Sequence, residues 1–275
     1  MPSFPPVPLT LEGSAVLHQF FRFNWTAWRA LPAAEQAAIQ ADFAATLKSL
    51  ERATPDGPIQ SGLFSELGHK GDLILMHLRP TFEDLNQVEL TLAQTRFSDF
   101  LTQVHSYVSV VELGLYESSQ KVYETASAKA ADFSPEWNAS VAESLNRAST
   151  HLMPRIYPPI PEFKYFCFYP MNRKRETGAN WFTVPFDERI RMMQEHGLIG
   201  RRYGDRVRQI VTSSIGFDDW EWGVTLFSDD AVAFKKLIYE MRFDEISAVY
   251  ALFGQFFLGV RLPIDNLPNW LQGKI

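Results

Sequence analysis

The sequence predicts an α+β fold in which two ferredoxin-like repeats form a dimeric α+β barrel unit within one chain. Strand-like and helix-like segments alternate along the chain, and the order found in the amino half recurs in the carboxyl half. In each half a strand leads through a helix to an Arg-Phe pair, Arg96-Phe97 and then Arg242-Phe243, before a further strand. Such repeats bury their apolar faces by packing two antiparallel sheets, backed by helices, into one body.

The amino half contains five predicted elements. Segments rich in aromatic and β-branched residues are typical of strands, and apolar residues that recur every three or four positions are typical of helices. On these criteria we expect strands over 16–25, 72–78 and 106–116, and helices over 33–52 and 82–100.

The carboxyl half repeats the pattern. We expect strands over 165–169, 207–213, 221–227 and 253–262, and helices over 186–196 and 231–242. In the first of these helices Asp187 is the expected N-cap and Gly197 the residue that follows the end. Asp229 and Asp230 are the expected caps of the second helix.

The predicted domain organisation has three parts. Residues 1–116 form the first repeat, and residues 154–275 form the second repeat. The segment 117–153 between them is an insertion rich in Ala, Ser and Glu, with Trp137 and Leu145 as expected anchors. A long insertion of this kind is either a lid or a surface appendage.

Composition excludes several classes of protein. The chain has 275 residues, of which 46% are hydrophobic, so it can bury a substantial core. Its single cysteine, Cys167, excludes an internal disulfide and a CxxC zinc site. The net charge of −6 disfavours nucleic-acid binding. No segment reads as a signal peptide, and the longest apolar stretch, near 249–260, is too short to span a bilayer, so a cytoplasmic protein is expected.

Several ordered segments of the chain carry a family resemblance. They are SYVSVVELGLY (106–116), CFYPMNRKRE (167–176), NWF (180–182), MMQEHGLIGRRY (192–203), QIVTSSIGFDDWEWGVTLF (209–227) and YEMRFDEISAVYALFGQFF (239–257). Together they resemble the coproheme decarboxylase branch of the chlorite dismutase-like superfamily. The resemblance covers roughly the whole second repeat and is weaker over the first. It therefore implies a haem or coproheme site in residues 154–275 and no porphyrin site in residues 1–116.

This resemblance implies a specific activity. Members of the branch have two ferredoxin-like repeats and usually assemble as homopentamers, and their substrate, iron coproporphyrin III, is also their redox cofactor. Hydrogen peroxide drives the stepwise loss of carbon dioxide from two propionates, and haem b is the product. The resemblance therefore implies a role in bacterial haem biosynthesis, with transient contact with the iron-inserting chelatase.

Two residues carry the implied chemistry. His196 matches the axial ligand of the iron, and a neutral imidazole is a suitable ligand for haem iron. Tyr169 matches the tyrosine that is oxidised to a radical and then takes a hydrogen atom from the propionate β-carbon. Without the flanking motifs, both would be read as ordinary structural residues.

The resemblance also implies a set of groups that bind the porphyrin carboxylates. They are Tyr116, Arg155, Arg173, Lys174, Arg242 and Ser247. The family usually has a lysine four residues after the reactive tyrosine, whereas this chain has Arg173 there and the lysine next to it. Arginine does not readily release a proton, so either Arg173 takes the role with a fixed charge or Lys174 turns inward. A solvated basic turn is the plain alternative.

The residue expected above the iron distinguishes related activities. Gln209 falls at this distal position and Met171 is expected to line the same pocket. Chlorite dismutases have an arginine at this position, so a neutral amide argues against chlorite as the substrate. Because Arg208 is adjacent, a shift of one residue in strand register would exchange the two side chains.

Other functions remain open on the sequence alone. A haem carrier without catalysis, a chlorite dismutase or peroxidase on the same fold, and a structural α+β protein that binds no porphyrin are the alternatives. His77, His105 and His151 lack the spacing of a metal site.

Overall fold

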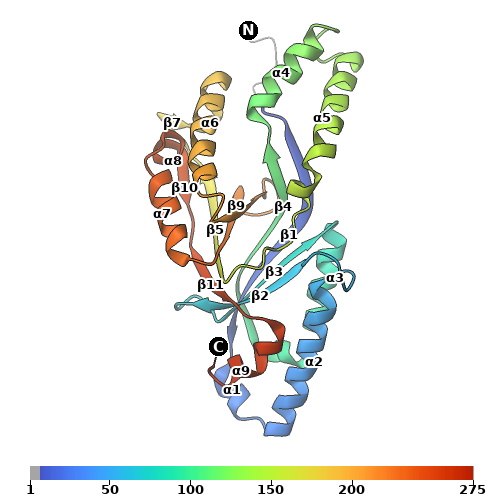
Figure 1. Cartoon of the computed structure of the whole chain (residues 1–275), viewed down its shortest axis with the longest axis vertical. Coiled ribbons are helices and arrows are strands. Elements are labelled where there is room, and N and C mark those ends of the chain that lie inside the picture. Colours follow the sequence, from blue (N-terminus) through green and yellow to red (C-terminus); the bar gives the residue numbers. More distant parts are fainter. Residues whose placement is uncertain (1–6, 275) are drawn as a thin grey trace.

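The computed structural model describes residues 7–274 and is built around one closed antiparallel sheet (Figure 1). Its strands are β1 (Thr10–Phe23), β2 (Ser61–Leu67), β3 (Leu73–Arg79), β4 (Leu101–Gly114), β5 (Tyr165–Arg173), β8 (Arg208–Ser213), β9 (Trp222–Ser228), β10 (Ala251–Phe253) and β11 (Phe257–Arg261). The order is β10-β5-β11-β2-β3-β1-β4-β8-β9. Because β5 also pairs with β9, the two ends of the sheet join and form a barrel, and β10 extends one end of β5.

The two halves of the barrel have the same topology. The first runs β1, α2 (Ala33–Glu51), β2, β3, α3 (Phe82–Ala93), β4, and the second runs β5, α6 (Phe186–Arg202), β8, β9, α7 (Ala231–Met241), β11. In each half the first strand lies between the third and the fourth, and the second strand lies beyond the third. This is the ferredoxin-like arrangement, so the predicted fold class is confirmed.

The strand β2 was not among the predicted elements. Its sequence SGLFSEL contains Ser, Gly and Glu, which weaken a strand signal. Two of its serines are nevertheless buried because side chains of the fold satisfy their hydroxyls: Ser61 Oγ lies 2.8 Å from His77 Nδ1, and Ser65 Oγ accepts a 2.9 Å hydrogen bond from Trp270 Nε1.

Two predicted segments are divided in the structure. The helix expected over 82–100 consists of α3 and a separate 3₁₀ helix, η1 (Arg96–Phe100). The strand expected over 253–262 consists of β10 and β11 with a break between them, where Gly254 donates a 2.8 Å hydrogen bond to the carbonyl of Pro170. A Cβ on Gly254 would lie 2.8 Å from Pro170, so this close approach requires glycine.

The helix that carries His196 is longer than expected. α6 continues through Gly197 and ends at Arg202, because Ile199 in its last turns is buried against α7. The expected N-cap was also wrong: the capping residue is Pro185, and Asp187 lies within the first turn, where its charge favours the helix dipole. In contrast, the expected cap Asp230 does accept a hydrogen bond at the start of α7.

The insertion between the repeats is a pair of helices, α4 (Tyr116–Ser127) and α5 (Pro135–Ile156), which stand at one end of the molecule (Figure 1). They pack on each other through Tyr123 and Trp137, whose rings stack 5.7 Å apart. The end of α5 is pressed against β1 at Gly13, where a Cβ would collide with the carbonyl of Ile156. Tyr116, expected to end a strand, instead begins α4.

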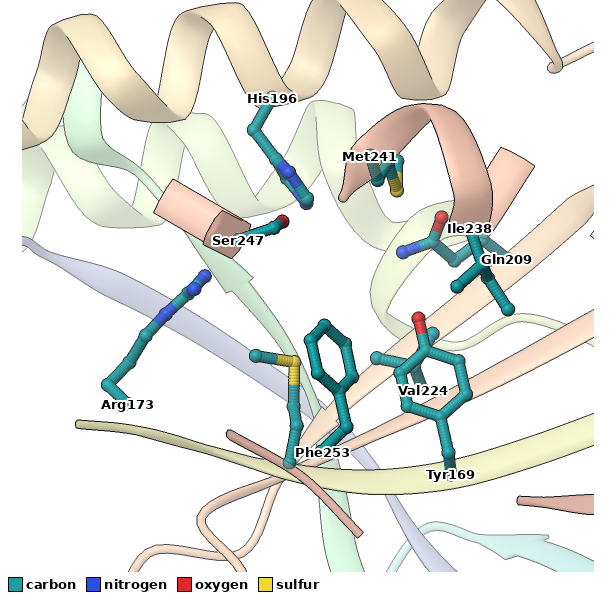
Figure 2. Close-up of a pocket in the computed structure, with 10 residues that line it drawn as sticks. Tyr169, Arg173, His196, Gln209, Val224, Ile238, Met241, Ser247 and Phe253 are labelled. Carbon is teal, nitrogen blue, oxygen red and sulfur yellow. The ribbon is translucent and has the colours of Figure 1, made fainter. Parts of the chain in front are cut away.

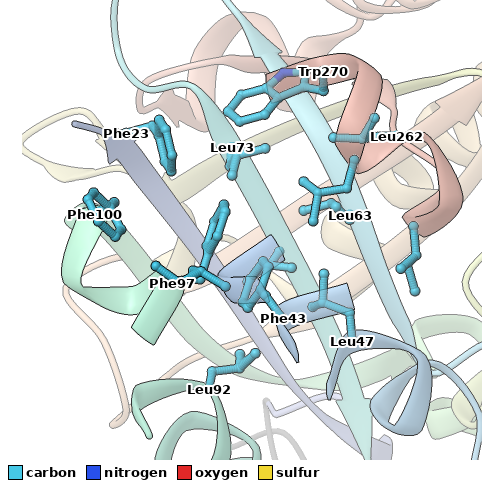
Figure 3. Close-up of a cluster of buried hydrophobic side chains, with 14 of the residues drawn as sticks. Phe23, Phe43, Leu47, Leu63, Leu73, Leu92, Phe97, Phe100, Leu262 and Trp270 are labelled. Carbon is cyan, nitrogen blue, oxygen red and sulfur yellow. The ribbon is translucent and has the colours of Figure 1, made fainter. Parts of the chain in front are cut away.

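The helix-facing side of the first repeat is filled with apolar side chains (Figure 3). Phe43 of α2 stacks on Phe97 with ring centroids 4.0 Å apart, and both are fully buried. Leu63 and Leu73 of the sheet and Trp270 of α9 (Leu267–Leu271) close this cluster. The cluster therefore packs α2 and α9 against the sheet of the first repeat.

Among residues 7–274 no helix combines the length and apolar character needed to cross a membrane.

Candidate active site

The second repeat contains a small pocket, with a cavity volume of about 40 Å³, between the outer face of its sheet and its helices (Figure 2). It is lined by Tyr169, Met171, Arg173, His196, Gln209, Val224, Ile238, Met241, Ser247 and Phe253. Figure 2 shows His196 entering from α6 and Tyr169 from β5, on opposite walls. Six of the residues expected at the site thus line one pocket, although they come from separate elements of the repeat.

One face of β5 supplies three of these residues. Tyr169, Met171 and Arg173 alternate along the strand, so their side chains point to the same side of the sheet. Lys174 follows the end of the strand, and its backbone N–H donates to the carbonyl of Tyr250 at 2.7 Å. Lys174 does not line the pocket, so the cation that β5 presents there is Arg173.

His196 is oriented by a carboxylate. Its Nδ1 lies 2.8 Å from Oδ2 of Asp244, a side chain that is 1% exposed. The carboxylate accepts a hydrogen bond from Nδ1–H. The proton of the neutral imidazole therefore stays on Nδ1, and the lone pair of Nε2 is available on the pocket side. Burial acts to raise the pKa of Asp244, but the hydrogen bonds from His196 and Ser247 outweigh it and hold that pKa below its usual value.

Asp244 also begins the helix α8 (Glu245–Tyr250). Its Oδ1 accepts a 2.8 Å hydrogen bond from the backbone N–H of Ser247, as an N-cap residue does. One carboxylate therefore fixes both the imidazole of His196 and the position of Ser247, two residues that line the pocket.

Tyr169 lies in an apolar environment. It is 5% exposed, and its ring stacks on Phe256 with centroids 4.5 Å apart. Burial raises the pKa of its phenol and so does neighbouring Cys167, whereas the charges of Arg242 and Arg173 act in the opposite direction. The phenol is therefore neutral at physiological pH, the form that can lose a proton together with an electron.

The arginines of the two Arg-Phe pairs have different surroundings. Arg96 in the first repeat forms a 2.7 Å ion pair with Glu35. Arg242 in the second lies 3.8 Å from the ring of Phe253, which lines the pocket. The carboxylates that could have paired with Arg242 are engaged elsewhere, since Glu240 binds Arg202 at 2.6 Å and Asp244 binds His196. Arg242 therefore lies beside the pocket without an ion pair among the described residues.

Two further residues expected at the site lie outside the pocket lining. Tyr116 packs 6.3 Å from the ring of Trp181, and burial raises its pKa while the charge of Arg173 lowers it. Arg155 is exposed near the end of α5. The structure thus brings Tyr116 close to the pocket wall and leaves Arg155 on the surface.

The strand register distinguishes Gln209 from Arg208. Gln209 pairs with Leu226 of β9, a residue of the cluster packed under α7, and it lines the pocket. Neighbouring residues of a strand point to opposite faces, so the side chain of Arg208 is directed away from this wall.

Three contacts at the site were not predicted from the sequence: Asp244 behind His196, Trp181 beside Arg173, and Phe256 on Tyr169. Asp244 could have been noticed as a helix cap, because it is followed three residues later by Ser247 and an apolar run. Its contact with His196, 48 residues away, leaves no trace in local spacing.

The lining combines apolar side chains with a few polar and charged groups. Val224, Ile238, Met241 and Phe253 provide apolar walls, and Arg173 provides a cation. Apolar walls with a few placed polar groups are typical of small-molecule sites. Across residues 7–274, no three His, Cys, Asp or Glu side chains gather to hold a metal ion.

Comparisons with known proteins agree with this geometry. The chain is 35% identical to a structure described as a novel heme-binding protein from Thermus thermophilus, over 98% of each chain and with a TM-score of 0.83. A mutant chlorite dismutase from Candidatus Nitrospira defluvii shares the fold at 17% identity, with a TM-score of 0.70 over 95% of this chain and 96% of that one. The model of the chlorite dismutase family matches residues 36–262. The chain therefore belongs to the chlorite dismutase family.

Proposed function

We propose that this protein is a hydrogen peroxide-dependent coproheme decarboxylase, which converts two propionates of iron coproporphyrin III to vinyl groups and releases haem b. The observation that carries the proposal is the placement of His196 and Tyr169 on opposite walls of one pocket. Family membership and the heme-binding relative support a porphyrin ligand. The motif around Tyr169 supports decarboxylation in particular.

His196 would bind the iron through Nε2. The Nδ1 proton is held by Asp244, so the imidazole presents its lone pair without a change of tautomer. The apolar walls would receive the porphyrin ring, and burying that ring supplies most of the affinity.

Tyr169 would relay the oxidation. Peroxide-oxidised iron porphyrin supplies the oxidising equivalents. The phenol loses one electron and its Oη proton, and the resulting radical takes a hydrogen atom from the propionate β-carbon, which restores the phenol. Loss of a second electron from the propionate radical, accepted by the oxidised substrate iron, would release carbon dioxide and leave a vinyl group. For each propionate, one hydrogen peroxide is consumed and two waters form, with one further proton taken up.

Arg173, Arg242 and Ser247 are the proposed carboxylate contacts, because they line or border the pocket. Arginine binds a carboxylate through two parallel N–H donors and keeps its charge, so Arg173 would hold the propionate without exchanging a proton. Tyr116, Arg155 and Lys174 lie outside the lining and are secondary candidates. Gln209 and Met171 would lie on the side where peroxide reacts.

One experiment separates this function from its alternatives. Hydrogen peroxide is titrated into the protein with iron coproporphyrin III, and the porphyrin masses are followed. Successive conversion of two propionates supports the proposal. Binding with an unchanged porphyrin mass would instead support a haem carrier without catalysis. Oxygen release from chlorite would support a dismutase.

Two variants test the roles of individual residues. Tyr169→Phe should bind iron coproporphyrin III as the wild type does and lose decarboxylation, and undiminished turnover would exclude the radical relay. His196→Ala should change the absorption spectrum of the bound iron porphyrin, and an identical spectrum would exclude the ligand assignment.

The resemblance further leads us to propose a homopentamer that receives its substrate from the iron-inserting chelatase. Light scattering on the purified protein tests the pentamer, and any other stoichiometry would refute it.

A further inference from the structure

Arg173 is a cation without a carboxylate partner. It is partly buried at the pocket wall, and among the residues that the structure describes no ion pair joins its guanidinium to an acidic side chain. The nearby carboxylates are already engaged, since Glu221 pairs with Arg175 at 3.3 Å and Asp244 binds His196. Burial lowers the pKa of Arg173 to about 10, which still leaves it charged at neutral pH.

Two contacts hold the guanidinium in place. Its Nη1 donates a long hydrogen bond, 3.4 Å, to the carbonyl of Ile246 at the start of α8. Its central carbon lies 5.2 Å from the ring of Trp181, within the range of a cation–π contact. The hydrogen bond is weak at this length, so the indole is the principal support of the guanidinium.

Trp181 itself is rigidly placed. It is 1% exposed and packs in a cluster with Met192 of α6 and Ile246 of α8. Its backbone N–H donates a 3.0 Å hydrogen bond to the carbonyl of Lys174, the residue after Arg173, so the indole is tied to the end of β5. The ring of Tyr250 lies 5.5 Å away on another side.

We propose that Trp181 is the positioning residue that holds Arg173 at the pocket wall, where the guanidinium binds a carboxylate of the porphyrin. A planar guanidinium stacks on an indole, whereas an ammonium does not share this geometry, so Trp181 makes arginine the suitable cation at position 173. The inference rests on the proposed function for the identity of the ligand. It adds the residue that fixes the position of the guanidinium that binds the carboxylate.

The chain provides a matched control. Phe182, next to Trp181, lies 5.9 Å from Arg175 in a similar cation–π contact, but its side chain is 44% exposed and neither residue lines the pocket. Phe182→Leu removes an aromatic partner of an arginine without touching the site.

The test measures binding without peroxide, by titrating the protein with iron coproporphyrin III and, separately, with iron etioporphyrin, which has no carboxylates. Trp181→Leu should raise the Kd for iron coproporphyrin III about 2- to 30-fold, the range of a cation–π contact, and leave that for iron etioporphyrin unchanged. Trp181→Phe should have a smaller effect, and Phe182→Leu none. Adding Trp181→Leu to Arg173→Gln should cause little further loss.

Two outcomes would overturn the inference: an equal loss of affinity for both porphyrins, or additive losses in the double variant. If Trp181→Leu does not fold, the same cycle with Trp181→Phe decides, because phenylalanine offers a weaker cation–π face. Failure of the proposed function can be distinguished from failure of this inference. A protein that binds iron coproporphyrin III without decarboxylating it would still give the binding results expected here.

Discussion

Asp244→Asn is the most informative single change to the candidate site, because one carboxylate serves two partners. Oδ2 lies 2.8 Å from His196 Nδ1, and Oδ1 accepts at 2.8 Å from the backbone N–H of Ser247. Asparagine has only one acceptor oxygen. It caps helices as well as aspartate does, so that oxygen can stay on Ser247 while the amide NH₂ faces the imidazole.

The expected consequence is a weaker iron ligand. An NH₂ group donates to Nδ1 and favours the tautomer with its proton on Nε2, the atom that must bind iron. A hydrogen bond to a charged group contributes about 1.5–3 kcal/mol, and removing the partner of a ligating histidine typically lowers metal affinity about 10- to 100-fold. Since about 1.4 kcal/mol corresponds to a factor of ten, the free energy of the hydrogen bond agrees with this loss of metal affinity. We therefore expect the Kd for ferric haem b to rise about 10- to 100-fold.

The assay is a titration with ferric haem b followed in the Soret band, together with thermal unfolding of the ligand-free protein. Asp230→Asn is the matched control, because Asp230 caps α7 through a 2.9 Å hydrogen bond from Val232 and does not line the pocket. It should leave haem affinity unchanged. Binding of ferric haem b by Asp244→Asn within twofold of the wild type would exclude this role of Asp244.

Two further predictions concern stability. Phe43→Ala should lower the free energy of unfolding by about 3–5 kcal/mol, because it leaves a cavity beside Phe97. It should not change the affinity for haem. Urea unfolding measures the stability and Soret titration the affinity, and a fall in affinity that accompanies the loss of stability would contradict the prediction. Burial raises the pKa of Glu66 from 4.5 to about 7, and no described residue donates a hydrogen bond to its carboxyl oxygens. The folded state therefore binds more protons than the unfolded state between those values, and its stability should fall as the pH rises from 4.5 to about 7, by at most about 3 kcal/mol. Glu66→Gln should flatten this slope in urea unfolding measured across that range, and an unchanged slope would exclude Glu66 as its source.

Local patterns were sufficient for much of the fold. Period-two and period-3.6 patterns depend on neighbouring residues, so they identified most strands and helices and the repetition between halves. They failed where tertiary contacts outweigh local preference. The serines of β2 are buried because His77 and Trp270 satisfy their hydroxyls, and α6 passes Gly197 because the turn beyond it packs on α7.

The features of the candidate site also fall into those that the sequence predicts and those that depend on tertiary contacts. The sequence by itself determined which residues could carry the chemistry, since the motifs around His196 and Tyr169 are contiguous in the chain, and strand alternation places Arg173 on the face of Tyr169. Only the tertiary structure decided that Asp244 orients His196 and that Trp181 supports Arg173. It also decided that Phe43 stacks on Phe97 between the helices and the sheet of the first repeat. These contacts join separate elements, and their formation depends on how the barrel closes, which no local spacing encodes.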